Sequence, residues 1–246
     1  METRGCLIVS DVDGTLLGDD NLLAEFAAWF EPRRDHVKLA LNSGRFYHSV
    51  KDSVLTTGLP DPDWIIGGVG TQMVEYSTEE KNSAWSDRFE KWDAKIIAEL
   101  FAPIEALVRQ PEEFQSPFKV SYYGYDLPED FIEDLRDKIK GAGLEAKVVY
   151  SSNRDLDILP AQADKGKATA FLAESLGVPA DRVIVCGDSG NDLAMFQQGF
   201  CGIAVANAHP ELKRLPAELV YQAETPFAGG VLEGVRHWLH RFEAET

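Results

Sequence analysis

The sequence predicts an α/β protein whose main part is a doubly wound, parallel, Rossmann-like sheet. Short apolar runs of the kind found in buried parallel strands recur along the chain. A polar or glycine-containing turn follows each run, and a helical pattern follows each turn, which is the rhythm of a doubly wound fold. The four runs cover residues 6–10, 37–41, 183–186 and 202–205.

Helical patterns alternate with these runs, as crossover helices should. They cover residues 22–30, 47–57, 165–176, 192–198 and 231–242. Between them, three strand-like stretches (119–123, 146–151 and 156–159) and two helical ones (94–107 and 129–140) break the rhythm. We therefore expect a catalytic core formed by residues 1–79 and 161–246, with a small α+β domain inserted at 80–160.

Composition excludes several classes of partner. The 246 residues carry 24 Lys plus Arg against 41 Asp plus Glu, a formal net charge of -17. That charge repels nucleic acid and anionic lipid, so neither is an expected partner. No stretch approaches the ~20 apolar residues of a membrane helix, and the first apolar run is too short for the core of a signal peptide, so we expect no export. Cys6, Cys186 and Cys201 form no metal-ligand spacing and indicate reduced thiols in a cytoplasmic protein.

The first apolar run ends in Asp11-Val12-Asp13-Gly14-Thr15. In an extended segment alternate residues point the same way, so Asp11 and Asp13 should both lie at the carboxyl edge of the sheet, where α/β folds bind ligands. Two adjacent carboxylates repel each other unless a cation or a shared proton compensates them. An acidic turn is the plainer interpretation of this segment taken alone.

A second acidic segment, Gly187-Asp188-Ser189-Gly190-Asn191-Asp192, follows another predicted strand. Oxygen-rich clusters without His or Cys suit Mg²⁺, which also bridges to substrate phosphate. Two such strand ends together favour a metal site over two unrelated turns.

Two further segments carry groups that bind phosphate. Asn42-Ser43-Gly44-Arg45 follows the second strand, and Asp164-Lys165-Gly166-Lys167 begins a helix. A hydroxyl, backbone amides at a helix start and a lysine can hold phosphate oxygens and neutralise their charge.

These four segments, in this order and spacing, resemble the four signature motifs of the haloacid dehalogenase superfamily. The resemblance implies that Asp11 is the nucleophile and a metal ligand, and that Asp13 is the general acid-base and gives Mg²⁺ its main-chain carbonyl. It further implies that Ser43 and Lys165 hold the phosphoryl group, that Asp188 completes the metal site with Asp192 orienting it, and that Asn191 is a nearby polar contact. Because members that attack phosphorus carry the second acid at the position of Asp13, phosphoryl transfer is favoured over dehalogenation.

Longer segments are similar to the sucrose-phosphate phosphatases of cyanobacteria and plants: residues 118–122, 150–160, 164–168, 185–192, 205–212 and 228–230. The resemblance implies hydrolysis of sucrose 6-phosphate, with the inserted domain as a mobile cap that selects the sugar, and a sucrose-phosphate synthase-type enzyme as a partner. Gly44 and Arg45 beside the phosphate, and Lys119, Arg154 and Asp157 in the cap, are the expected substrate contacts. Lys119 could equally face solvent.

One position departs from that family. Where it usually has Gly-(Ser/Thr)-Glu, this chain has Gly70-Thr71-Gln72. An amide both donates and accepts hydrogen bonds whereas a carboxylate only accepts, so Gln72 is a candidate selectivity residue and mannosylfructose phosphate a competing substrate.

Two other functions remain open at this stage. Phosphomannomutases share the Asp-x-Asp-Gly-Thr start but need a second anion site, and the inserted region has few basic residues. Inactive phosphatase-like modules tend to lose acidic motif residues, whereas this chain retains Asp11, Asp13, Lys165, Asp188 and Asp192.

Overall fold

The chain folds into two compact units. The structure is a computed structural model that describes residues 5–151 and 153–244. Met1–Asn82 and Asp164–Thr246 form one unit, which we call the core unit, and Ser83–Ala163 form the other, the inserted unit. Both boundaries fall three residues after the expected ones at 79 and 160.

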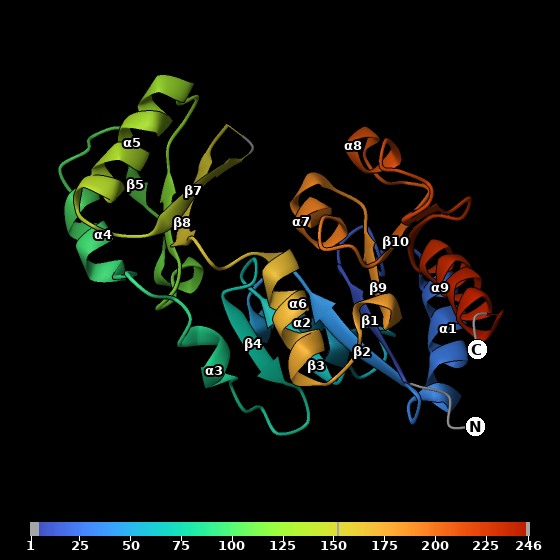
Figure 1. Cartoon of the computed structure of the whole chain (residues 1–246). Helices are drawn as coiled ribbons and strands as arrows, with labels where there is room; N and C mark the ends of the chain where they lie inside the picture. Colours follow the sequence, from blue (N-terminus) through green and yellow to red (C-terminus); the bar gives the residue numbers. More distant parts are fainter. Residues whose placement is uncertain (1–4, 152, 245–246) are drawn as a thin grey trace. The chain divides into compact units, whose positions relative to one another are not determined.

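The core unit is built on a seven-stranded sheet with strand order β11-β10-β9-β1-β2-β3-β4 (Figure 1). All neighbouring strands pair in parallel except β3 and β4, which are antiparallel. Every residue of β1 is buried, because helices cover a parallel sheet on both faces. The predicted doubly wound α/β class is confirmed. The strands are β1 (Cys6–Ser10), β2 (Val37–Asn42), β3 (Trp64–Gly67), β4 (Gln72–Glu75), β9 (Val183–Gly187), β10 (Cys201–Ala204) and β11 (Val220–Gln222).

The helices of the core unit are α1 (Asp20–Phe30), α2 (Tyr47–Thr56), α6 (Lys165–Ser175), α7 (Leu193–Phe196), α8 (Pro210–Lys213) and α9 (Phe227–Ala244). The first and last of the long helices, α1 and α9, pack against each other (Figure 1). Among the described residues, no helix combines the length and apolarity needed to cross a membrane.

Two predicted helices of the core unit have different bounds. The helix expected at 192–198 is a 3₁₀ turn over Gly190–Asp192 followed by α7, which ends at Phe196. The helix expected at 231 begins earlier, at Phe227. Its first turn contains Gly229 and Gly230, although glycine is unfavourable within helices. A side chain at Gly230 would lie 2.2 Å from the Thr225 carbonyl oxygen, so close backbone approach requires glycine there.

The inserted unit is a four-stranded antiparallel sheet with order β5-β6-β8-β7. Helices α4 and α5 pack on one face of it and bury a small core that includes Ile97, Phe101, Tyr122 and Leu156. The helix expected at 94–107 ends at Phe101, because Pro103 cannot continue it. The elements are α3 (Ser83–Ser86), α4 (Ala94–Phe101), β5 (Val108–Arg109), β6 (Val120–Tyr123), α5 (Glu129–Gly141), β7 (Ala146–Ser151) and β8 (Asp155–Pro160).

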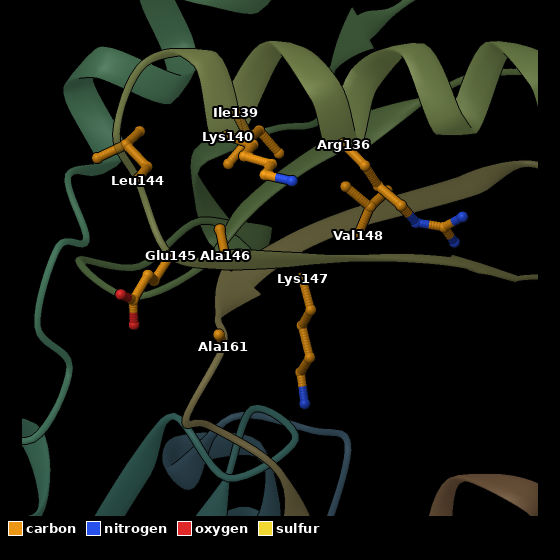
Figure 2. A pocket seen from close by; sticks show the side chains of 9 residues that line it. All are labelled: Arg136, Ile139, Lys140, Leu144, Glu145, Ala146, Lys147, Val148 and Ala161. Carbon is orange, nitrogen blue, oxygen red and sulfur yellow. The ribbon is translucent and has the colours of Figure 1, made fainter.

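A shallow pocket of about 440 Å³ lies in the inserted unit between α5 and β7. Ile139 and Val148 belong to its apolar lining, whereas Arg136 and Lys140 add positive charge from α5 (Figure 2). Lys147 extends away from α5, as expected for a β7 residue that alternates with the core-facing Val148 (Figure 2). None of the three predicted sugar contacts of this unit lines the pocket.

Candidate active site

Strand pairing brings the two acidic segments together. Ser10 of β1 lies opposite Cys186 of β9, and the Asp11 N–H donates to the Cys186 carbonyl at 3.0 Å. The segments that follow the two strands therefore begin side by side at the carboxyl edge of the sheet. Carboxylate oxygens of Asp11, Asp188 and Asp192 lie within 4.8 Å of one another.

A buried lysine lies at the centre of this cluster. The Nζ atom of Lys165 is 2.5 Å from Oδ1 of Asp11 and 2.6 Å from Oδ1 of Asp192, and its side chain has no solvent exposure. It also donates to Oδ1 of Asn191 at 3.3 Å. A buried ammonium is tolerated only when it is paired in this way.

The start of α6 fixes the position of Lys165. Asp164 accepts a hydrogen bond from the Lys167 N–H at 2.7 Å, which starts the helix at Lys165. Asn42, at the end of β2, donates through Nδ2 to the Lys165 carbonyl at 3.0 Å and to the Thr169 hydroxyl at 3.1 Å. A side chain at Gly166 would lie 2.0 Å from the Ala194 carbonyl oxygen, so glycine lets α6 approach α7.

The charges of the cluster shift the pKa values of its members. Burial, together with the charges of Asp192 and Asp188, holds the pKa of Asp11 well above its usual range, although Lys165 opposes the shift. Burial and the neighbouring Asp192 also raise the pKa of Asp188. Burial alone would lower the pKa of Lys165, but Asp11 and Asp192 outweigh it and keep that pKa raised. The lysine is therefore charged, and the carboxylates repel one another.

Both carboxylate oxygens of Asp192 bond to other groups of the core unit. Its Oδ1 contacts Lys165, and its Oδ2 accepts from the backbone amides of Asp188 and Ser189 at 3.1 and 3.2 Å. These contacts fit the orienting role that the resemblance implies, because they hold both the lysine and the Asp188 backbone.

Thr15 is a site residue that sequence reasoning missed. Its hydroxyl lies 3.4 Å from Oδ2 of Asp11 and 3.3 Å from Oδ1 of Asp188. Thr15 ends the first motif segment, but nothing in that segment indicates its contact with Asp188, which lies 173 positions away.

Asp13 lies beside Arg45. Oδ2 of Asp13 is 2.8 Å from Nε of Arg45, and the Asp13 side chain is 59 % exposed. Arg45 also donates from Nη1 to the Ser53 hydroxyl at 2.9 Å. The predicted substrate contact Arg45 is thus held against the expected acid-base.

The segment before Arg45 leaves room for a ligand. Ser43 is buried, and its hydroxyl accepts the Arg45 N–H at 3.1 Å. Apart from Gly44 itself and the two adjoining residues, no atom lies within 4 Å of the point where a side chain would begin at Gly44. This opening suits the phosphate contact predicted for Ser43 and Gly44.

Gln72 is tied to the start of α2. Its Oε1 accepts the Tyr47 N–H at 2.8 Å, which satisfies a helix N–H that lacks an intrahelical partner. A glutamate could accept the same bond. Glutamine and glutamate at this position therefore differ in their second polar group. That group is an NH₂ donor in Gln72 and would be an acceptor oxygen in a glutamate.

In the inserted unit, Lys119 and Asp157 form an ion pair of 2.9 Å and are 12 and 19 % exposed. Asp157 also accepts from the Ser121 hydroxyl at 2.7 Å. Lys119 is thus mostly enclosed rather than facing solvent. Arg154 is half exposed and pairs with Asp155, and residue 152 of the same predicted segment lies outside the described residues.

The donor set fits a hard divalent cation. Asp11 and Asp188 offer carboxylate oxygens in a cluster that contains neither histidine nor cysteine, which is the preference of Mg²⁺. Burial first, and then the neighbouring carboxylates, raise the pKa values of Asp11 and Asp188, and a cation at this point would favour their ionised forms.

A family model described as sucrose-6F-phosphate phosphohydrolase matches residues 4–239. The chain belongs to this family. The predicted superfamily and the predicted enzyme class, a phosphoric monoester hydrolase, are confirmed with it.

Individual relatives agree with the assignment. A mannosylfructose-phosphate phosphatase of Agrobacterium fabrum is 35 % identical over 94 % of this chain and 96 % of its own length. Sucrose-phosphatase 1 of Nicotiana tabacum is 32 % identical over 94 % of this chain, which spans 59 % of the tobacco protein.

Solved structures of other proteins share this fold. The sucrose-phosphatase of Synechocystis, crystallised with sucrose and phosphate, matches with a TM-score of 0.83 and 33 % identity over 96 % of this chain and 98 % of its own. A haloacid dehalogenase-like hydrolase of Bacillus subtilis shares the fold at a TM-score of 0.72 and 17 % identity, over 96 and 93 % of the two chains.

We predict that Lys165→Met destabilises the metal-free protein most strongly at alkaline pH. Removing the ammonium leaves Asp11 and Asp192 buried without a counter-charge, a loss of about 3 kcal/mol. The pKa of Asp11, already raised, rises further, so below that pKa the carboxyl is neutral and stability returns. Thermal unfolding in excess chelator should show a large Tm difference from the native protein at pH 8 and a smaller one at pH 5.

Lys167→Met is the matched control, because Lys167 lies on the same helix with a half-exposed side chain. Its effect should stay below about 0.5 kcal/mol at both pH values. Equal losses at pH 5 and pH 8 for Lys165→Met would contradict the charge argument.

Proposed function

We propose that the chain is a magnesium-dependent sugar phosphatase that hydrolyses sucrose 6-phosphate to sucrose and inorganic phosphate. One observation carries the proposal: Asp11 lies almost buried at a strand end, paired with Lys165 and facing Asp188. This is the arrangement that a carboxylate nucleophile requires, and the family match supplies the reaction class.

The first half of the reaction transfers the phosphoryl group to Asp11. A carboxylate oxygen attacks phosphorus, the bond to the sugar oxygen breaks, and Asp13 gives its proton to that oxygen as the alcohol leaves. Ser43 and Lys165 hold the phosphoryl oxygens, and Arg45 keeps the Asp13 side chain in place. Asp11 and Asp188 would hold Mg²⁺, which neutralises phosphoryl charge when bound.

The second half releases phosphate. Asp13, now ionised, takes a proton from water, the water oxygen attacks phosphorus, and the bond to Asp11 breaks. Asp11 leaves as a carboxylate and Asp13 is again protonated, so both groups return to their starting states. Asp192 does not react; it holds Lys165 and the Asp188 backbone throughout.

Mannosylfructose phosphate is the second candidate substrate. The Agrobacterium phosphatase named for it is similar over nearly the full length of both chains, and Gln72 stands where sucrose-phosphate phosphatases usually have glutamate. The mannosyl and glucosyl rings differ in the orientation of one hydroxyl, a difference that a single donor or acceptor can read.

In this proposal the enzyme acts in the cytoplasm, and a sucrose-phosphate synthase-type enzyme supplies its substrate. The buried thiols of Cys6 and Cys186 support this setting. The inserted unit, with Lys119, Arg154 and Asp157, is the proposed sugar-selecting cap.

The proposal is tested by measuring phosphate release from a panel of sugar phosphates with Mg²⁺ present. Sucrose 6-phosphate should give the highest kcat/KM, and excess chelator should silence the enzyme until Mg²⁺ is restored. Interconversion of hexose 1- and 6-phosphates without phosphate release would instead indicate a mutase. Full activity in chelator would refute the metal role.

Asp11→Asn should abolish turnover, because an amide cannot form the acyl phosphate. The expected loss is about 10⁴-fold or more, with the fold intact by circular dichroism. Asp13→Asn should lose about 10² to 10⁴-fold on sugar phosphates but less on an activated aryl phosphate, whose leaving group needs no proton. Appreciable sugar-phosphate turnover by Asp11→Asn would disprove the covalent step.

Gln72→Glu should change substrate preference while keeping the fold. The carboxylate still accepts the Tyr47 N–H and adds negative charge at the start of α2, so stability should rise by about 0.3–1 kcal/mol. Loss of the NH₂ donor should shift the kcat/KM ratio between mannosylfructose and sucrose phosphates toward sucrose 6-phosphate by about tenfold. An unchanged ratio would remove Gln72 from the selectivity residues.

A further inference from the structure

Asn207 joins three segments that are distant in the sequence. Its Nδ2 donates to the Gly14 carbonyl at 2.7 Å, and its Oδ1 accepts the Phe227 N–H at 2.9 Å. The first partner lies in the turn after β1, and the second is the first residue of α9. A carbonyl can only accept and an N–H can only donate, so these partners fix which way the amide points.

The loop that carries Asn207 also reaches the second acidic segment. It follows β10, and its His209 N–H donates to the Asp188 carbonyl at 2.7 Å. Ala206 in the same loop donates its N–H to the Thr225 carbonyl at 3.1 Å. The loop is therefore bonded to both turns that carry the catalytic acids and to the segment leading into α9.

Asp11 and Asp13 differ in how firmly they are held. Asp11 directly follows β1, and its N–H is bonded to Cys186, so the sheet positions it. Asp13 lies beyond the strand in a turn closed by the Leu16 and Leu17 amides, which donate to the Val12 carbonyl. Its side chain is mostly exposed and is steadied by Arg45.

Gly14, directly after Asp13, is packed tightly. Its φ of 80° is a conformation that favours glycine, and a side chain there would lie 2.6 Å from Oδ2 of Asp188. The Asn207 bond holds the carbonyl of this residue, and so the Gly14–Thr15 peptide, in the turn that directly follows Asp13.

We infer that Asn207 is a positioning residue that holds the Asp13–Gly14 turn in its reactive conformation. The inference rests on the proposed function, in which Asp13 exchanges the proton, and it extends that function to a residue outside the four motifs. Displacing a reacting group by about 1 Å costs on the order of 10²-fold in rate, which sets the scale of the effect.

Two substitutions remove the bond from Asn207 to Gly14, and only one of them also removes the bond to Phe227. Asn207→Asp keeps an acceptor for Phe227 but places an oxygen against the Gly14 carbonyl, whereas Asn207→Ala loses both bonds. Both should lower kcat for the preferred sugar phosphate by about 10 to 100-fold, with KM changed less than about threefold. If kcat falls in both variants, the negative charge that aspartate adds is not the cause, because alanine adds none.

Glu233→Ala is the matched control. Glu233 accepts from the Tyr221 hydroxyl and from the amides of Glu224 and Thr225, so it steadies the same approach to α9 without touching the turn after β1. It should lower Tm and leave kcat within about twofold. Destabilisation of the C-terminal region by itself would then be excluded as the cause.

A double-substitution cycle with an activated aryl phosphate tests the route through Asp13. If Asn207 acts through that group, Asn207→Ala should slow the Asp13→Asn protein clearly less than it slows the native one. Independent, additive losses would overturn the inference. An unchanged kcat in both Asn207 variants would overturn it as well.

Hydrogen exchange of the metal-free protein gives a measurement that does not depend on activity. Amides of residues 12–17 should exchange about tenfold faster in Asn207→Ala than in the native protein or Glu233→Ala. Faster exchange in a protein that releases phosphate from no sugar phosphate would refute the proposed function while the positioning contact stands. Unchanged exchange in an active enzyme would refute the positioning role alone.

Discussion

The core unit depends on the buried contact of Lys165 with Asp11 and Asp192. The three acids of the cluster face one ammonium, which leaves uncompensated negative charge in a place with little water. Such an arrangement costs folding free energy, and it persists where function requires it. In the proposed function a divalent cation would supply the missing charge, and the same cation would help a strongly acidic protein accept a phosphate dianion.

The fold brings the residues of this cluster together at a few points where backbone segments lie close to one another. Parallel pairing of β1 with β9 sets Asp11 beside Asp188, and Gly166 lets α6 come near enough to α7 for Lys165 to reach both acids. Asn42 then bonds the end of β2 to the first turn of α6. Each constraint acts on the backbone, so the side chains of the cluster stand on rigid elements, as the proposed catalysis requires.

The sequence predicted the features that depend on neighbouring residues and missed those that depend on tertiary contacts. Parallel strands such as β1 and β9 are buried on both faces and therefore appear as apolar runs, and the motif acids directly follow them. The strands β3 and β4 were missed because four residues are too few for a clear periodic pattern, and the start of α9 was placed four residues too late. Thr15, Asn42 and Asn207 have no signal in their spacing, since each acts through a partner more than 120 positions away.

The polar networks of the two units differ in a way that suits their proposed roles. In the core unit, the oxygens of Asp192 are used by Lys165 and two amides, which suits a group that must hold others still. In the inserted unit, one oxygen of Asp157 pairs with Lys119 and the other accepts from the Ser121 hydroxyl. A carboxylate oxygen accepts more than one hydrogen bond, so Asp157 is fixed in orientation yet retains capacity for a hydroxyl. A side chain already ordered in this way loses little entropy when it binds, which is the property that a proposed sugar-selecting residue needs.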